Sequence, residues 1–481
     1  MLDLGDSPDK ACNITVIPQT EKDAFLSDCD SDGSDMDYEG ESGHLPAKLL
    51  NAYAELQQTD HDRNNVINDD DIPLTTTPST PPSAVHDKEP VTSMSQKVQS
   101  EKPRAKLQVV KNKDRVFKRS KRPASTVIPK HIVYSPNAAE CIKQSCPDPM
   151  DVFLLMYPPT LREITIEMSN LYSTQTKDQQ LYLSMEELLT FYGILITSGY
   201  SSVPRRHMYW SLDSDVHNES ISDAMRRNRF DEIMASIHVV DNTKITDDPF
   251  FKVRTIFSEL NQSYKVMPFQ EWLSVDESMI RYYGRHGCKQ FIRGKPIRFG
   301  YKLWSLASSS GYMHHMEPYG GSHTLLPETG LGQGPSVVLG LAEQAQVPQG
   351  CKFIHDNLFT SLGLLDEMTK RRYGSSGIMR QNRLFDVPFK PQKEFMKLSR
   401  GTSEVLTQGD KLLVRWRDNN VVTVATNMEE KYSETFVKRW NKEQRTFDKV
   451  PQPKCINLYN EHMGGVDLHD QQIVLTLCLS L

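Results

Sequence analysis

The first 145 residues of the chain contain no tryptophan and carry too little apolar mass to build a protein core. All five tryptophans lie at or beyond Trp210. Residues 23–41 carry eight carboxylates and no Lys or Arg, and residues 71–85 are rich in Thr and Pro. A segment of this composition cannot bury enough apolar surface to offset the conformational entropy that it loses on ordering. We therefore expect a disordered arm over residues 1–145 and a folded region that begins near residue 146.

The end of this arm is strongly basic. Residues 102–122 contain ten Lys and Arg residues against one acid, Asp114, and they close with KRSKR at 118–122. Such a run is typical of a nuclear import signal or of a segment that contacts phosphates, although it can also serve solubility alone. We expect import, and hence a nuclear protein.

Cysteine usage and hydropathy narrow the class of protein further. The eight cysteines are scattered and none forms a C-x-x-C pair, so we expect neither structural zinc nor a disulfide framework, but a reducing intracellular compartment. The first ten residues lack a signal-peptide pattern, and the longest terminal apolar run, IVLTLCLSL, has nine residues. Because a membrane span needs about 20 residues, we expect a soluble chain with no membrane partner.

The pattern becomes helical at residue 146 and stays so to about residue 268. In LSMEELLTFYGILITSGY, Ser184 and Glu187 form the signature of a capping box before a long apolar run. Farther along, Arg226, Arg227 and Arg229 cluster in a second predicted helix. These arginines could face DNA phosphates or form the solvated side of a surface helix. Taken alone, the segment favours the second interpretation.

Strand patterns dominate beyond residue 270. EWLSVDESMIRYY and YKLWSLASSSGYMHHM are typical of strands, and GCKFIHDNLFTSLGLLDEMTK predicts a short buried strand that leads into a helix. KLLVRWRDNNVVTVATN predicts a hairpin. The chain is therefore expected to contain a helical domain over 146–268, an α/β core over 269–372, a β-rich insertion over 373–455 and the end of the core over 456–481.

Three aspartates stand out because each lies at a buried strand or at a backbone break. Asp276 interrupts the strand WLSVDESM, Asp356 ends the strand CKFIHDN, and Asp467 follows Gly464 and Gly465. A charge beside a buried strand is costly unless it is paired or binds a metal. Two Mg²⁺ ions held by three or four carboxylates can stabilise the attacking and leaving oxygens of a phosphoryl transfer. The alternative for each aspartate is a helix cap or a strand-end charge.

A basic strip surrounds the first of these aspartates. Residues 278–316 contain no Asp or Glu. The Lys and Arg residues of this strip are Arg281, Arg285, Lys289, Arg293, Lys295, Arg298 and Lys302. A carboxylate beside a cationic strip suits the cleavage of a polyanion, because contacts to phosphates hold the backbone in place. The RGKP within the strip lacks the Gly and the Ser or Thr that a P-loop requires.

Four motifs, in this order, resemble the transposases of the piggyBac transposable-element family: SVDESMIRYYGRHGCKQFIRGKPIRFGYKLW, HDNLFTSLGLL, NNVVTVATN and YNEHMGGVDLHD. The resemblance covers about 146–472 and is greatest to the piggyBac-derived proteins of vertebrate hosts. It implies an RNase H-like catalytic core with a β-rich insertion, preceded by a helical dimerisation and DNA-binding domain. It also implies cut-and-paste transposition at TTAA sites with two Mg²⁺ or Mn²⁺ ions.

The functional residues of that family correspond to matching positions in these motifs. The metal-binding aspartates are Asp276, Asp356 and Asp467, and Asp470 is a further carboxylate one helical turn later. The DNA contacts are expected at seven basic residues, six of them by resemblance and Lys289 from its place in the strip: Arg285, Lys289, Arg293, Lys295, Arg298, Arg380 and Arg383. Gly464 and Gly465 would let the backbone approach the core before the helix of Asp467 begins.

The sequence departs from the family after about residue 472. The family continues with a long helical stretch and a cysteine-rich zinc domain, whereas QQIVLTLCLSL stands here in their place. We expect a C-terminally truncated product that binds double-stranded DNA as a homodimer or as a dimer with longer relatives. Two functions stay open: a DDD-type, metal-dependent DNA nuclease and strand transferase, or a domesticated nuclear DNA- or chromatin-binding protein without catalysis.

Overall fold

A computed structural model describes residues 12–17, 53–58, 117–118, 138–292, 295–384, 386–429, 431–441 and 444–478. Most of the arm predicted over 1–145, including all of KRSKR except Lys118, lies outside these residues, so the disorder of the arm stays a prediction. Within it, β1 (Cys12–Ile17) pairs antiparallel with β2 (Tyr53–Gln58), and α1 is Ala138–Ser145. No helix of the described part is both long and apolar enough to cross a membrane.

Between residues 149 and 266, all of which are described, the regular structure of the region predicted as helical consists of helices. Its α-helices are α2 (Pro149–Met156), α3 (Pro159–Lys177), α4 (Met185–Tyr200), α5 (Glu219–Ala224), α6 (Arg227–Met234) and α7 (Phe251–Ser263). Ser184 caps α4, because its side chain accepts from the Glu187 amide while the Glu187 carboxylate accepts from the Ser184 amide. The predicted capping box is thus confirmed.

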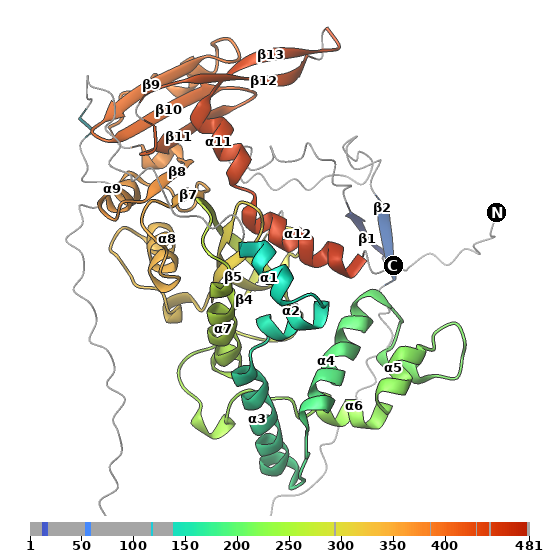
Figure 1. Cartoon of the computed structure of the whole chain (residues 1–481). Helices are drawn as coiled ribbons and strands as arrows, with labels where there is room; N and C mark the ends of the chain where they lie inside the picture. The colour runs from blue at the N-terminus through green and yellow to red at the C-terminus, as the bar shows by residue number, and fades with distance from the viewer. Residues whose placement is uncertain are drawn as a thin grey trace, which may run out of the picture. The chain divides into compact units, whose positions relative to one another are not determined.

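A large mixed sheet follows the helices (Figure 1). Its strands are β3 (Trp272–Arg281), β4 (Lys289–Phe291), β5 (Phe299–Ser308), β6 (Met313–Pro318), β7 (Lys352–His355), β8 (Gly374–Ile378), β9 (Ser403–Gln408), β10 (Lys411–Arg417) and β11 (Val421–Thr426). The order is β4-β5-β3-β7-β8-β11-β10-β9, and β6 pairs with the part of β5 that β4 leaves free. The β3–β7 and β7–β8 pairs are parallel and the others antiparallel.

The two faces of the central strands have different partners. Leu273 and Val275 of β3 join an apolar core with side chains from α8 (Gln333–Gln344) and α9 (Leu362–Lys370). Because side chains alternate along a strand, the residues between them face the other side. There α12 (Gly465–Cys478) packs across β3 and β5. Strand β3 is therefore covered by helices on both faces, as strands of parallel pairs usually are.

The stretch predicted as a β-rich insertion continues the same sheet and then leaves it. The predicted hairpin is present as β10 and β11, and β11 pairs with β8, which itself lies beside β7. A short α10 (Gln392–Phe395) precedes β9. The strands β12 (Glu434–Asn441) and β13 (Thr446–Pro453) form a separate pair, and α11 (Lys454–His462) leads from them back to α12. The chain thus returns to the central strands at residue 463.

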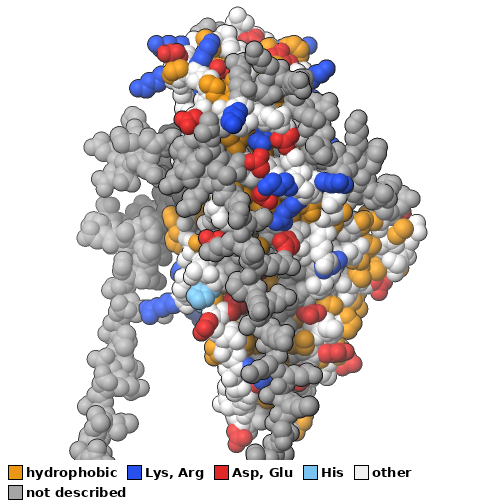
Figure 2. Space-filling model, turned by 90° about the vertical axis from the view of Figure 1, so that its left-hand side faces the viewer, with side chains coloured by type: hydrophobic (Ala, Val, Ile, Leu, Met, Phe, Trp, Pro, Cys, Tyr) orange, Lys and Arg blue, Asp and Glu red, His pale blue; other side chains and the backbone are white. Residues whose placement is uncertain are grey.

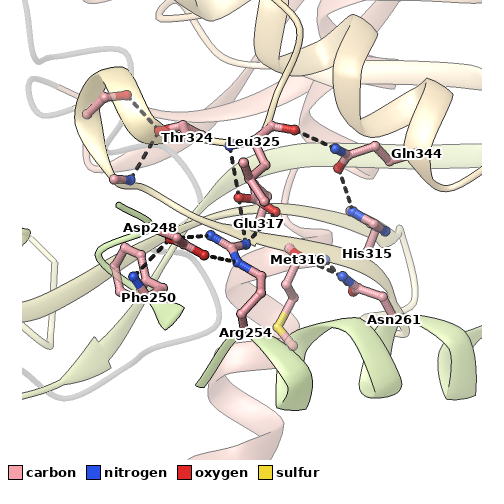
Figure 3. Close-up of polar contacts among 12 residues, drawn as sticks. Asp248, Phe250, Arg254, Asn261, His315, Met316, Glu317, Thr324, Leu325 and Gln344 are labelled. Carbon is pink, nitrogen blue, oxygen red and sulfur yellow. Dashed lines mark hydrogen bonds and ion pairs between the residues drawn. The ribbon is translucent and has the colours of Figure 1, made fainter. Parts of the chain in front are cut away.

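A polar clamp ties the last helix before the sheet to strand β6 (Figure 3). Arg254 of α7 donates two hydrogen bonds to Asp248, of 2.7 and 3.0 Å, and its Nη1 lies 2.9 Å from Glu317 Oε1. Nearby, the Asn261 side chain donates to the Met316 carbonyl and accepts from its amide, both at 2.9 Å. These contacts fix α7 against β6 with defined register.

Candidate functional site

One face of β3 carries three polar residues in alternation, and the two serines among them bind the segment that contains α12. Ser274 Oγ donates to the Met463 carbonyl, and Ser278 Oγ donates to Asp470 Oδ1 at 2.6 Å. Asp276 lies between the two serines and is 5% exposed. The period of two along a strand therefore directs Ser274, Asp276 and Ser278 toward the segment that contains α12.

Asp356 lies beside Asp276 because β3 and β7 run parallel in a fixed register. Val275 pairs with His355, the last residue of β7. The next residue of β3 is Asp276 and the residue directly after β7 is Asp356, so the register brings these two aspartates next to each other. Asp356 Oδ1 accepts from the Leu358 amide at 2.7 Å, which holds the carboxylate at the turn after β7. Burial raises the pKa of Asp276, and the negative charge of Asp356 raises it further. The prediction that these two aspartates lie together is consistent with this register.

Gly465 permits the close approach that places Asp467 over β3. A Cβ atom at this position would lie 2.3 Å from the Ser308 carbonyl oxygen and 3.0 Å from the Ser274 Cβ. Real Cβ atoms do not tolerate such a contact with backbone, so the first turn of α12 can touch the sheet only where glycine stands. The helix begins at Gly465 and has Asp467 in its first turn. Gly465 therefore lets the backbone approach the sheet closely, which is the role expected for the glycine break.

Lys295 lies between two of the predicted metal ligands. Its Nζ is 3.4 Å from Asp276 Oδ2 and 3.0 Å from Asp467 Oδ1. Burial raises the pKa of Asp276 well above its usual range, and the carboxylates of Asp356 and Asp467 raise it further, while the Lys295 ammonium opposes this shift. Burial alone would lower the pKa of Lys295, but the charges of Asp276 and Asp467 outweigh it and raise that pKa. Lys295 is therefore a charged ammonium inside an acidic site.

Asp470 lies at the edge of this cluster. Burial raises its pKa, and the hydrogen bond from Ser278 partly counteracts the effect. Because Asp467 and Asp470 are three residues apart in α12, they share one side of the helix. Asp470 is thus oriented by β3, as expected for a carboxylate that supports the site.

The donor types of this cluster fit a hard divalent ion. Carboxylate oxygens are the ligands that Mg²⁺ and Mn²⁺ take in proteins. Ser305, the cross-strand partner of Asp276, is fully buried, and its Oγ has no hydrogen-bond partner among the described residues. Within the same residues, no three His, Cys, Asp or Glu side chains are close enough to hold a metal as they stand. The carboxylate ligands suit Mg²⁺ or Mn²⁺, but in this arrangement the Lys295 ammonium lies between Asp276 and Asp467.

The predicted DNA-contacting arginines of the HDN and MRQNR motifs flank Asp356. Arg380 Nε donates to Asn357 Oδ1 at 2.8 Å, and Arg383 Nη1 donates to the Thr360 carbonyl at 2.8 Å. Asn357 and Thr360 belong to the segment directly after Asp356. The structure therefore brings both arginines to the carboxylate cluster.

The remaining residues of the basic strip lie around β4. Arg285 and Arg298 are exposed and Lys289 is half-buried, whereas Arg293 lies outside the described residues. Figure 2 shows one face of the molecule, on which Lys and Arg side chains gather in the upper half beside several carboxylates. Of the described members that were expected to bind phosphates, Lys295 differs from the rest because it pairs with protein carboxylates.

Arg229 of the predicted arginine cluster is used inside the protein. Its guanidinium contacts Glu187 and Glu232, each at 2.7 Å. Its neighbours Arg226 and Arg227 are exposed. Arg229 is therefore not on a solvated face, because its guanidinium is paired with two glutamates of the protein.

Two functional contributors were missed at the level of sequence. Ser274 and Ser278 flank Asp276 at i−2 and i+2 and bind the segment of α12, a spacing that can be read in LSVDESM. The pairing of Lys295 with the aspartates has no such sequence signal, because it depends on the tertiary position of Lys295 against β3 and α12.

Comparison with known proteins identifies similar chains. A family model described as Transposase IS4 matches residues 148–475. Human PiggyBac transposable element-derived protein 3 is 39% identical over 340 residues, which are 68% of this chain and 57% of that protein. Human PiggyBac transposable element-derived protein 2 is 34% identical over 342 residues, 69% of this chain and 57% of that protein. This chain thus spans little more than half the length of these curated relatives.

One solved structure has a similar fold. It is a cryo-EM structure of a piggyBac transposase synaptic complex with hairpin DNA, which matches with a TM-score of 0.55 and 21% identity. The match covers 75% of this chain and 72% of the other. At this identity the match concerns the mixed α/β fold with its large sheet.

Proposed function

The chain belongs to the piggyBac transposable element-derived family and carries a transposase domain, and from this premise we propose that it binds double-stranded DNA through a metal-dependent nuclease core. The observation that supports the proposal is that the carboxylates of Asp356, directly after β7, and of Asp467 in α12 both act on the buried Asp276 of β3. Arg380 and Arg383 contact the segment that follows Asp356. We propose that β6-β5-β3-β7-β8 is an RNase H-like core. The sheet order and the family resemblance support it.

In this proposal the residues that hold divalent ions are Asp276, Asp356 and Asp467, with Asp470 beside them. Mg²⁺ or Mn²⁺, when bound, supplies an activated water and stabilises charge on a phosphate. Ser278 orients Asp470 through its hydrogen bond. Burial at β3 keeps water away from Asp276 and strengthens its interaction with any cation. Arg380 and Arg383 lie where they can receive the phosphates of a strand that reaches Asp356.

The strip residues Arg285, Lys289, Arg293 and Arg298 are proposed to bind phosphates along the approach to the cluster. Each phosphate contact contributes about 0.9 to the slope of log K against log salt on duplex DNA. Replacement of Arg285, Lys289 and Arg298 by Ala is therefore expected to flatten this slope by about 3 units. Fluorescence anisotropy with a TTAA-containing duplex measures it.

A matched variant controls for net charge. Lys143, Lys244 and Lys397 are exposed lysines outside the strip, and their replacement by Ala removes the same charge. An unchanged slope in the strip variant, or an equal change in the control variant, would contradict a phosphate-binding role for the strip.

A second function is favoured by one observation. The Lys295 ammonium between Asp276 and Asp467, together with the lack of a ready metal group among the described residues, favours a domesticated DNA- or chromatin-binding protein without catalysis. Nicking of TTAA-flanked DNA in Mn²⁺ and in EDTA, with Asp356→Asn as the control, distinguishes the two. Mn²⁺-dependent nicking that Asp356→Asn abolishes supports the nuclease.

We further propose a nuclear location and a dimer. The basic run 118–122 supports import, and the family resemblance supports dimerisation through the helical region and a preference for TTAA. The nuclear location is tested by replacing the basic run with Ala, which should abolish nuclear accumulation. Sedimentation of the full chain tests the second.

A further inference from the structure

The ammonium of Lys295 lies where the acidic site most needs positive charge. The Lys295 side chain is 21% exposed, and it contacts a buried carboxylate on one side and a half-exposed one on the other. Asp276, Asp356 and Asp467 repel one another, and burial increases this repulsion. The Lys295 ammonium offsets part of it. Lys295 therefore acts as the counter-ion of the cluster in this conformation.

The same lysine belongs to the strip that is proposed to bind DNA. An ammonium is a compact charge on a flexible four-carbon stem, so Lys295 can reach either the carboxylates or a nearby phosphate. It cannot neutralise both at once. The two partners of Lys295 thus define two arrangements of the site.

We infer that Lys295 is an internal counter-ion that couples DNA to metal: it leaves Asp276 and Asp467 for a DNA phosphate, and only then do these carboxylates accept a divalent ion. This inference rests on the proposed DNA- and metal-binding function. Without DNA, a divalent ion has to displace the ammonium from two carboxylates and leave it half-buried without a partner. With DNA, a phosphate receives the displaced charge.

The coupling has a thermodynamic consequence that can be measured without catalysis. If DNA favours the arrangement in which the carboxylates are available, DNA must tighten the binding of a divalent ion. By reciprocity, the divalent ion must tighten the binding of DNA by the same factor. If Lys295 had a purely structural role, DNA would not change the affinity for the divalent ion through this lysine.

The test measures the affinity of the full chain for Mn²⁺, with and without a short TTAA-containing duplex. The electron paramagnetic resonance signal of free Mn²⁺ reports how much of the ion is bound. In the unaltered chain we expect the duplex to tighten Mn²⁺ binding by at least about fivefold, within the usual range of coupling between sites. This comparison needs no substitution. A duplex that leaves Mn²⁺ affinity unchanged would overturn the inference.

Lys295→Met separates this role from direct coordination of Mn²⁺ by phosphate. The variant removes the competing charge, so DNA-free Mn²⁺ binding should tighten by about fivefold or more, and the added effect of DNA should shrink accordingly. Lys397→Met, the loss of one charge at an exposed lysine outside the strip, should keep the coupling of the unaltered chain. Equal coupling in Lys295→Met and the unaltered chain would overturn the inference while leaving the metal site intact. Absence of Mn²⁺ binding in every variant, with or without DNA, would overturn the metal site and this inference together.

Discussion

Ser278 in β3 and Asp470 in α12 are 192 residues apart in the sequence, yet the serine hydroxyl donates to the aspartate carboxylate at 2.6 Å. This hydrogen bond and that of Ser274 to the Met463 carbonyl hold the α12 segment on the same face of β3. Between them lies Asp276. The two serines therefore set the depth at which the carboxylates of α12 lie over the sheet.

Ser278→Ala is expected to destabilise the protein in a pH-dependent way. Burial raises the folded-state pKa of Asp470, and the Ser278 hydrogen bond lowers it, so loss of the bond raises this pKa further. Without the bond, the folded protein favours protonated Asp470 more strongly. The variant therefore loses stability as pH rises through the folded pKa and Asp470 has to ionise without the bond. The cost should therefore be about 1–3 kcal/mol near pH 7 and smaller near pH 4.5.

Urea denaturation of the variant at both pH values measures this cost. Ser274→Ala serves as the matched control, because its hydroxyl binds a carbonyl that does not titrate. A cost for Ser278→Ala that is the same at the two pH values would show that Asp470 does not titrate against this bond.

Gly465→Ala is expected to lift α12 from β3. The new Cβ would meet the Ser308 carbonyl oxygen at 2.3 Å, and overpacking of this kind costs about 1–3 kcal/mol. Amide hydrogen exchange should speed up at the start of α12, and Mn²⁺ binding should weaken. Gly193→Ala in α4, where a Cβ meets nothing within 4 Å, should instead stabilise its helix by about 0.5–1 kcal/mol. Equal behaviour of the two variants would contradict the close approach at Gly465.

Arg254→Met is expected to loosen the helical region from the sheet. The substitution leaves Glu317, whose side chain is 7% exposed, without its guanidinium partner, and loss of one partner of a buried pair costs about 3–5 kcal/mol. Arg206→Met breaks an exposed pair with Asp231 and should cost less than about 1 kcal/mol. Calorimetry should show a second, lower transition for Arg254→Met. The double variant with Glu317→Gln should recover part of the loss.

Acid is expected to unfold the core through buried histidines. Burial lowers the pKa of His314 and His315 to about 4 and that of His355 to about 3. Because these values lie below the unfolded value near 6.5, the stability they contribute is complete above pH 6.5. It is lost as pH falls from about 6.5 toward 4 for His314 and His315, and toward 3 for His355.

Urea denaturation at several pH values between 7 and 5 measures this loss as a drop in the urea midpoint. His314→Phe should reduce the drop, because the buried Nε2 of His314 has no partner among the described residues and its ring stacks on Phe269. His207→Gln, a change at an exposed histidine, should leave the drop unchanged. A drop that His314→Phe does not alter would assign the acid sensitivity to other groups.

Each of the three aspartates could be singled out from the sequence because it breaks a local pattern. Asp276 interrupts an apolar strand, Asp356 ends one, and Asp467 follows two glycines. Strand ends and glycine breaks are local features, so they can be read without knowledge of the fold. The parallel register of β3 and β7 then brings the first two together.

Features that depend on distant pairing could not be predicted. The hairpin of β10 and β11 was visible locally, but its attachment to β8 was not. Arg415 in β10 has the sequence of an exposed strand residue, yet it is 1% exposed and donates to the Lys390 carbonyl and to Gln381 Oε1. The place of Lys295 between two aspartates likewise depends on tertiary contacts with β3 and α12 and not on any periodicity.

The position of α12 over β3 has a consequence for how the protein is made. Translation proceeds at about 5–20 residues per second, so roughly 10 to 40 s separate the synthesis of Asp276 from that of Asp467. During this interval the nascent chain on the ribosome has β3 but lacks the segment that completes the carboxylate cluster. Any activity that requires all three aspartates therefore begins only when the last turns of the described chain have emerged and closed over the sheet.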